Sequence, residues 1–267
     1  MFELFQYGFV VRGLEAGVII AIVAPLIGTF LVLRRYSLIA DTLSHVSFAG
    51  VALGFLLGLN PIITAIVAAV GSSLAIEKLR SSKRVFGESA LSLFLSGSLA
   101  VAVILISLYH GFSVNLSNYL FGSIVTVTQG DLYIVAGAGA VAVVSVLAFY
   151  KELVFISFDE EAATVAGLPV KALNSLLIVM AALTVALAIP IVGILLISAL
   201  VVVPVLTALQ FRLSFTKTVL AAEAASLISV ISGIIVSFYL DLSTGGTIVL
   251  IALLLFVVSL GFSKQKS

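Results

Sequence analysis

The chain has 267 residues, of which 62% are hydrophobic and only 9% are charged, and its formal net charge is +1. A water-soluble domain ordinarily carries about 25% charged residues, so this composition excludes a soluble protein. The chain contains no cysteine, which excludes disulfides and thiolate metal ligands.

The chain divides into apolar runs of roughly 17–23 residues, the length that crosses a hydrocarbon core of about 30 Å as a helix. Because lipid offers no hydrogen bonds to the backbone, such runs must be helical. We therefore predict an all-α polytopic membrane protein with eight or nine transmembrane helices in one domain, residues 1–267. The nine predicted segments are 16–33, 39–58, 60–76, 89–109, 131–150, 174–190, 193–209, 218–240 and 245–262.

The sixth and seventh segments are separated only by Pro190-Ile191-Val192-Gly193. A proline followed closely by a glycine ends one helix and turns the chain into another, so we predict two helices here. The alternative is one long kinked helix.

The basic residues indicate how the segments are oriented. They follow the first, third, fifth, seventh and ninth segments, and only Arg12 falls on the other side. The positive-inside rule therefore places these loops and the C-terminus in the cytoplasm and the N-terminus outside. Eight helices would break this parity unless a segment such as 113–128 re-enters the membrane from outside. The basic residues used are Arg34, Arg35, Lys78, Arg80, Lys83, Arg84, Lys151, Lys171, Arg212, Lys217, Lys264 and Lys266.

The longest predicted cytoplasmic loop contains a short helix. Three consecutive acids open it, as at a helix N-terminus, and a glycine and a proline close it. These residues are Asp159, Glu160, Glu161, Gly167 and Pro169. Because three acids suit an anionic membrane surface poorly, a docking surface for a protein partner is a better interpretation than a simple interfacial helix.

Two ionisable residues lie well inside the second segment. Asp41 and His45 are four residues apart and so share one helix face, roughly 9 and 15 Å beyond Arg35. A charged side chain at mid-membrane costs at least about 2.5–3.5 kcal/mol and ordinarily faces a cavity or a partner. Glu223, on the eighth segment, lies at a depth similar to that of Asp41.

Two carboxylates and an imidazole at matching depth form a candidate site for a divalent metal. Carboxylate oxygen suits Mn²⁺, and imidazole also suits Zn²⁺ and Fe²⁺. The alternatives are an interhelical hydrogen-bond cluster or an ion pair at a helix end.

The opposite face of the second segment carries small residues at spacings of three, four and four. Such a stripe lets a neighbouring helix approach closely, so we predict helix packing on this side. The stripe comprises Ser47, Gly50, Gly54 and Gly58.

The run from Gly28 to His45, GTFLVLRRYSLIADTLSH, strongly resembles the zinc/manganese-type ABC permease family. The resemblance continues through nearly the whole chain in order, with no large insertion or missing block. It covers 46–52, Asn118–Gly122, Phe158–Gly167, 192–200, Pro204, Gly233, Ser237 and Tyr239.

The resemblance implies a homodimeric permease in the cell membrane, bound by two cytoplasmic ATPase subunits and supplied by an external metal-binding protein. Zinc, manganese or iron would be its substrate, moved by alternating access, with no permanent cofactor and no nucleic-acid partner. By the same resemblance, Asp41 and His45 handle the metal, whereas Glu223 matches no family motif. The segment that couples to the ATPase would comprise Phe158, Asp159, Glu160, Glu161, Ala162 and Gly167.

The absence of two motifs narrows the alternatives. The sequence lacks G-x-x-x-x-G-K-[ST], so ATP hydrolysis would belong to a separate subunit, and it lacks the H-E-x-x-H of a zinc protease. One alternative is an ABC permease for a metal chelate, although Asp41 and His45 argue against a cavity without titratable groups. The other is an ion-coupled metal transporter without an ATPase, but the internal repeat typical of such carriers is not evident.

Overall fold

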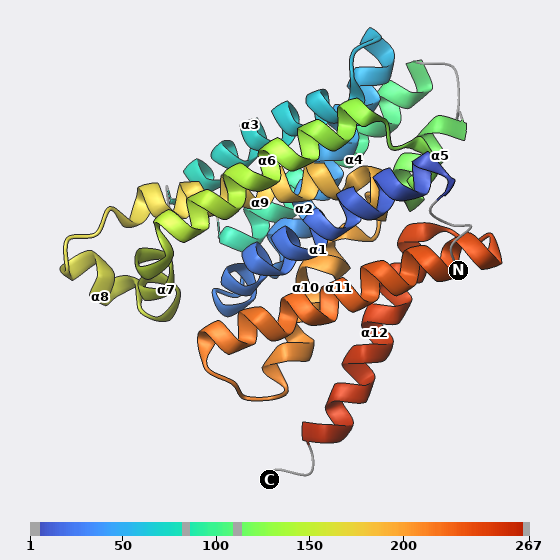
Figure 1. Ribbon diagram of the computed structural model, residues 1–267. Helices are drawn as coiled ribbons and strands as arrows, with labels where there is room; N and C mark the ends of the chain where they lie inside the picture. The colour runs from blue at the N-terminus through green and yellow to red at the C-terminus, as the bar shows by residue number, and fades with distance from the viewer. Residues whose placement is uncertain (1–5, 82–85, 109–113, 264–267) are drawn as a thin grey trace.

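Figure 1 shows the computed structural model, which describes residues 6–81, 86–108 and 114–263. The described residues form helices and no strand. The helices are α1 (Gly8–Leu33), α2 (Ser37–Leu57), α3 (Pro61–Ser81), α4 (Gly87–Leu108), α5 (Val114–Phe121), the 3-10 turn η2 (Ile124–Thr126), α6 (Gln129–Ala148), α7 (Tyr150–Phe158), α8 (Glu160–Val165), α9 (Val170–Val192), α10 (Ile197–Leu209), α11 (Phe215–Leu240) and α12 (Thr244–Ser263). Four of the basic residues used for orientation, Lys83, Arg84, Lys264 and Lys266, lie outside the described residues.

Eight of these helices are long and apolar enough to cross a membrane: α1, α2, α3, α4, α6, α9, α11 and α12. The remaining predicted segment, the seventh (193–209), corresponds to α10, an apolar helix of only 13 residues, about 20 Å long. The prediction of an all-α polytopic membrane protein with eight or nine spans is confirmed.

The predicted break between the sixth and seventh segments is also confirmed, but Gly193 makes it rather than Pro190. α9 continues two residues past Pro190 and ends at Gly193, whose φ is +85°. The next residues turn and hydrogen-bond to the end of α5, with Ile194 N donating to Tyr119 O at 3.0 Å. Helix α10 therefore begins four residues later than predicted.

The bundle has two distinct ends. Figure 1 shows α7 and α8 at one end, called the α8 end below, and α5 and the start of α1 at the opposite end, called the α5 end. A hydrogen bond of 3.1 Å between the hydroxyls of Tyr150 and Thr216 brings the start of α11 to the α8 end. Arg12 Nε donates to Val127 O at 3.0 Å at the α5 end.

The described basic residues follow this division. Arg34 at the end of α1 contacts Glu160 of α8, and Arg80 at the end of α3 lies over the ring of Tyr36. Lys151 and Lys171 belong to the start of α7 and of α9. Basic residues thus collect at the α8 end, with Arg12 as the exception at the other.

Segment 113–128 does not cross the bundle. Its described part consists of α5 and η2, which lie at the α5 end where α6 begins. Gly122, with φ +76°, lies so close to the backbone of Ile191 that a side chain there would clash. The described part of this segment begins and ends at the α5 end, so it adds no further crossing of the bundle.

Candidate functional site

Asp41 and His45 lie on the one face of α2 that the described residues leave largely uncovered. Both are half-buried, as is Ala49, while Leu38 is 58% and Leu53 39% exposed. These five residues recur every three or four positions and form a continuous strip, called the open face of α2 below. Most of the remaining α2 residues up to Gly54 are buried.

The open face carries unused ligand atoms. His45 Nδ1 is buried and has no hydrogen-bond partner among the described residues. Within the same part of the chain, the Asp41 carboxylate makes no ion pair or hydrogen bond, although its backbone oxygen accepts from Ser44 Oγ at 2.7 Å. Buried polar atoms are normally paired, so an unpaired imidazole nitrogen one turn from a carboxylate indicates a place for a ligand.

Glu223 does not join this pair within one chain. It is half-buried on α11, which packs mainly on α1, α10 and α12, whereas α2 packs mainly on α3, α4, α9 and α10. Across the described ranges, no three His, Asp or Glu side chains gather as a metal site. Asp41 and His45 are therefore two neighbouring candidate ligands, and no third such side chain joins them in the part of the chain that the structure describes.

The small-residue stripe of α2 has two different roles. A β-carbon added at Gly50 would lie 2.7 Å from the Cα of Ala65, and one at Gly54 would lie 2.9 Å from the Cα of Pro61. These two glycines thus bring α2 against the first turns of α3. A β-carbon added at Gly58 would meet nothing within 4 Å, and this residue instead ends α2 in the left-handed conformation, with φ +66°. Ser47 is fully buried.

The predicted short helix in the loop before α9 is present as α8. Asp159 is its N-cap and accepts a hydrogen bond from Ala162 N at 2.8 Å. Gly167, with φ +83°, follows its end. Ala163 is fully buried and packs the helix against the bundle.

α8 presents an apolar and acidic surface away from the bundle. Phe158 is 68% and Val165 90% exposed, and Glu161 and Ala162 are exposed beside them. The Phe158 ring also meets that of Phe215 edge-on, with centroids 6.1 Å apart, which ties this surface to the start of α11.

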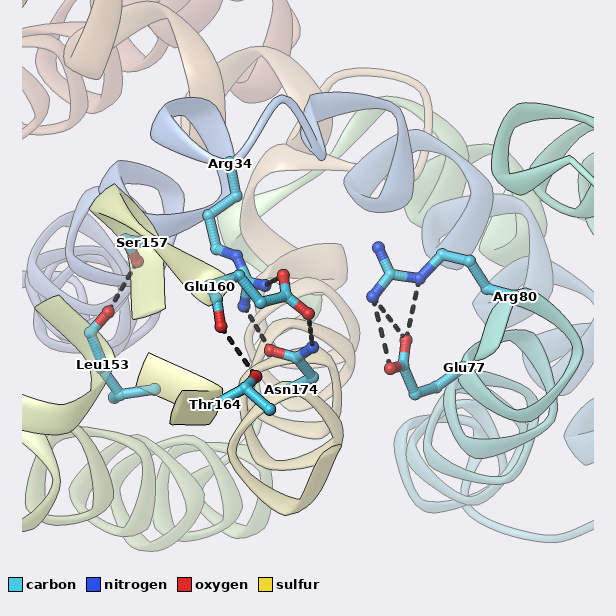
Figure 2. A network of polar contacts seen from close by, with 8 residues as sticks. All are labelled: Arg34, Glu77, Arg80, Leu153, Ser157, Glu160, Thr164 and Asn174. Atoms are coloured by element: carbon cyan, nitrogen blue, oxygen red, sulfur yellow. Dashed lines mark hydrogen bonds and ion pairs between the residues drawn. The ribbon is translucent and has the colours of Figure 1, made fainter. Parts of the chain in front are cut away.

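Glu160 differs from its acidic neighbours because its carboxylate binds side chains from two other helices. Its carboxylate pairs with Arg34 at 2.6 Å and accepts from Asn174 Nδ2 at 3.1 Å (Figure 2). The sequence reasoning missed Asn174 and this use of Arg34. The one signal was a polar amide at the start of an otherwise apolar segment.

A cavity of about 560 Å³ adjoins the open face of α2. It lies between α2, α3 and α4, and its lining, which includes Ala49 and Leu53, is almost wholly apolar. α4 itself is largely exposed. The cavity thus extends the uncovered surface from the Asp41 and His45 strip across to α4.

Comparison with known proteins agrees with this architecture. Residues 6–263 match the model of the ABC 3 transport family, and the chain belongs to that family. It is thus a multi-pass membrane subunit of the permease type.

Three relatives align over nearly their full length. The chain is 36% identical over 263 residues to a probable metal transport system membrane protein of Treponema pallidum, covering 96% of each chain. It is 30% identical over 264 residues to the manganese transport system membrane protein MntC of Halalkalibacterium halodurans, covering 99% of this chain and 90% of that one. It is 33% identical over 254 residues to the high-affinity zinc uptake system membrane protein ZnuB of Haemophilus influenzae, covering 95% of this chain and 97% of that one.

A solved structure shares the fold. PsaBC from Streptococcus pneumoniae, determined in complex with Fab, superposes with a TM-score of 0.87 at 30% identity, covering 99% of this chain and 97% of that one. The arrangement of α1–α12 is therefore that of a solved member of this structural class.

Proposed function

We propose that this chain, acting as one transmembrane domain, is the permease subunit of an ATP-driven importer of a divalent transition metal ion. The observation that carries the proposal is the open face of α2, where the Asp41 carboxylate and the unpaired His45 Nδ1 lie one helical turn apart. Relatives named for manganese and for zinc support the class of substrate.

The chemistry of the pair fits a metal that must be released again. A carboxylate and an imidazole suit Mn²⁺, Fe²⁺ and Zn²⁺, and the chain has no cysteine to hold a soft metal tightly. Transport requires binding weak enough to allow release, so a site with few protein ligands is suited to it. The metal is the cargo, and no permanent cofactor is proposed.

A second copy of the chain would complete the site. Two ligands are too few for the four that zinc ordinarily takes, and a twofold axis along the open face would bring two Asp41 and two His45 together. The same arrangement would remove Asp41 from lipid, where a charge costs at least about 2.5–3.5 kcal/mol. We therefore propose a homodimer with the metal path between the protomers.

The α8 end would face the cytoplasm, since the described basic residues collect there and Arg12 alone lies at the α5 end. The C-terminus would then be cytoplasmic and the N-terminus external in the cell membrane. A cytoplasmic ATPase dimer, which hydrolyses the ATP, would dock on the exposed Phe158, Glu161 and Val165, whereas the Glu160 carboxylate is held within the chain by Arg34. An external metal-binding protein would deliver the ion to the α5 end.

Glu223 would meet the cation at about the same depth as the Asp41 and His45 pair. It lies eight residues into α11, about 12 Å from the helix start at the α8 end. A half-buried carboxylate at that depth would add to the attraction of the cation into the permease. Nucleotide-driven movement of α8 would open an exit to the cytoplasm and close the external side in alternation.

The proposal is tested by metal-stimulated ATP hydrolysis in liposomes that contain the chain, its ATPase and its binding protein. Zn²⁺, Mn²⁺ and Fe²⁺ are compared in the wild type and in His45→Ala. Stimulation by one metal that is lost in the variant supports the proposal and names the cargo. A rate of ATP hydrolysis that none of the three metals changes contradicts the proposal.

A further inference from the structure

The Arg34 side chain joins three helices at the α8 end. Its Nη2 donates to Glu160 Oε2 of α8 at 2.6 Å, and its Nη1 donates to Asn174 Oδ1 of α9 at 2.5 Å. Asn174 Nδ2 donates in turn to Glu160 Oε1 at 3.1 Å, which closes a triangle (Figure 2). The Arg34 side chain is 3% exposed and that of Glu160 46%, so the triangle runs from the bundle interior to the surface at α8.

Arg34 also begins the tight turn that leads into α2. Arg35 has φ +58°, its N donates to Val32 O at 3.0 Å, and Tyr36 N donates to Leu31 O at 2.7 Å. This pair of hydrogen bonds is the Schellman closure, here with an arginine in the position that usually holds glycine. α2 starts at the next residue, so a displacement of Arg34 would be passed directly to the helix that carries Asp41 and His45.

The ring of Tyr36 extends the connection to α3. The Arg34 guanidinium lies 5.0 Å from its centroid and the Arg80 guanidinium lies 4.1 Å from it. Arg80 is in turn paired with Glu77 at 2.9 Å. Two cations on one aromatic ring fix the position of the α1–α2 turn relative to α3.

Glu160 is the point at which α8 enters this network. Among the described residues, it makes the only side-chain hydrogen bonds that join α8 to another helix. The fold of α8 does not depend on them, because its N-cap is Asp159 and its buried anchor is Ala163. The Glu160 charge can therefore be removed without removing the helix.

We propose that the triangle of Arg34, Glu160 and Asn174 is the positioning element that couples α8 to α2, so that movement of α8 changes the placement of Asp41 and His45. This inference rests on the proposed function and specifies how the nucleotide signal reaches the metal pair. Arg34 and Glu160 act as positioning residues, and neither contacts the metal or the nucleotide.

The test measures metal ions transported per ATP hydrolysed by the permease–ATPase complex in liposomes, supplied with the metal that stimulates the wild type. Glu160→Gln keeps the shape of the side chain and removes its charge. Arg34→Glu, Glu160→Arg and the exchanged pair Arg34→Glu with Glu160→Arg form, with the wild type, a double-mutant cycle. Glu88→Gln is the matched control, since Glu88 is exposed at the start of α4 near the same end.

We expect Glu160→Gln to form the complex and to hydrolyse ATP without metal at the wild-type rate. Metal transported per ATP falls at least about fivefold, the lower range of coupling between two sites. The exchanged pair recovers more than half of what Arg34→Glu loses, and Glu88→Gln behaves as the wild type. Recovery by the exchanged pair is a result that loss of stability alone would not give.

Three results would overturn the inference. The first is an unchanged transport ratio in Glu160→Gln, and the second is an exchanged pair no better than Arg34→Glu. The third is loss of the complex in Glu160→Gln, which would make Glu160 a direct ATPase contact. A wild type that no metal stimulates overturns the proposed function and this inference with it, whereas a stimulated wild type with an equally coupled Glu160→Gln overturns the inference alone.

Discussion

Gly28 of α1 lies directly against the carbonyl oxygen of Val201 in α10, where a β-carbon would fall far inside van der Waals contact. Both residues are buried. In lipid, helices associate mainly by close packing, since the lipid chains are as apolar as the side chains. The glycine therefore lets the short α10 bind against the bundle near the end of α1 that carries Arg34.

Gly28→Ala is expected to destabilise the protein by about 1–3 kcal/mol, because the added methyl forces the two backbones apart. The measurement is the unfolding temperature of the purified protein in detergent. Gly137→Ala on α6 is the control, since a methyl there meets nothing within 4 Å and alanine is the better helix former. Equal unfolding temperatures for the two variants would contradict the packing described here.

Asp41→Asn and His45→Gln are expected to lower metal affinity by at least about tenfold while the protein still folds. Each change keeps the approximate size of a half-buried side chain and removes a ligand atom or charge. Binding of the stimulating metal to the purified permease measures the loss. Ala49→Ser on the same face is the control, and a metal affinity in both variants equal to that control would count against the assignment.

A cysteine placed on the open face of α2 is expected to cross-link two copies of the chain in the membrane. The chain has no cysteine of its own, so Ala49→Cys provides a single reactive position per protomer. The control is Val67→Cys on α3, a position that is 67% exposed outside the open face. A bifunctional thiol reagent should give dimers with the first variant and monomers with the second. The reverse pattern would place the dimer interface elsewhere.

Val165→Asp is expected to weaken binding of the ATPase about tenfold, because an exposed apolar contact becomes charged. A tenfold loss of affinity corresponds to about 1.4 kcal/mol of binding free energy. The permease should fold normally, since Val165 is 90% exposed. Co-purification of the ATPase at increasing salt measures the effect. Leu213→Asp, in the connection between α10 and α11, should retain the ATPase, and equal loss in both variants would argue against docking on α8.

Much of the fold was predictable because the lipid bilayer restricts the structure that a long apolar segment can adopt. Long apolar runs must be helices, and Asp159 and Gly167 bound α8 in sequence as they do in space. The helix ends were less predictable because contacts of charged side chains let the helices continue beyond the apolar runs. α1 starts eight residues before the predicted segment, with Arg12 bonded to Val127, and α3 continues to Ser81 through the Glu77–Arg80 ion pair.

The site was predictable only in part. Spacing alone put Asp41 and His45 on one face, because both lie on the same helix. Depth suggested that Glu223 lay beside them, but depth fixes one coordinate, and α11 packs away from α2 across the bundle. The sequence did not reveal that the Glu160 carboxylate bonds within the chain, because its partners Arg34 and Asn174 are 126 and 14 residues away. Gly58 matched the packing spacing, yet it ends the helix.

The most direct test of the central claim is accumulation of metal inside liposomes that contain the permease, the ATPase and the binding protein. We predict that Mn²⁺, Zn²⁺ or Fe²⁺ accumulates only when ATP is hydrolysed, and that Asp41→Asn abolishes it. Accumulation driven by a proton or sodium gradient in liposomes without the ATPase would contradict the account and identify an ion-coupled carrier.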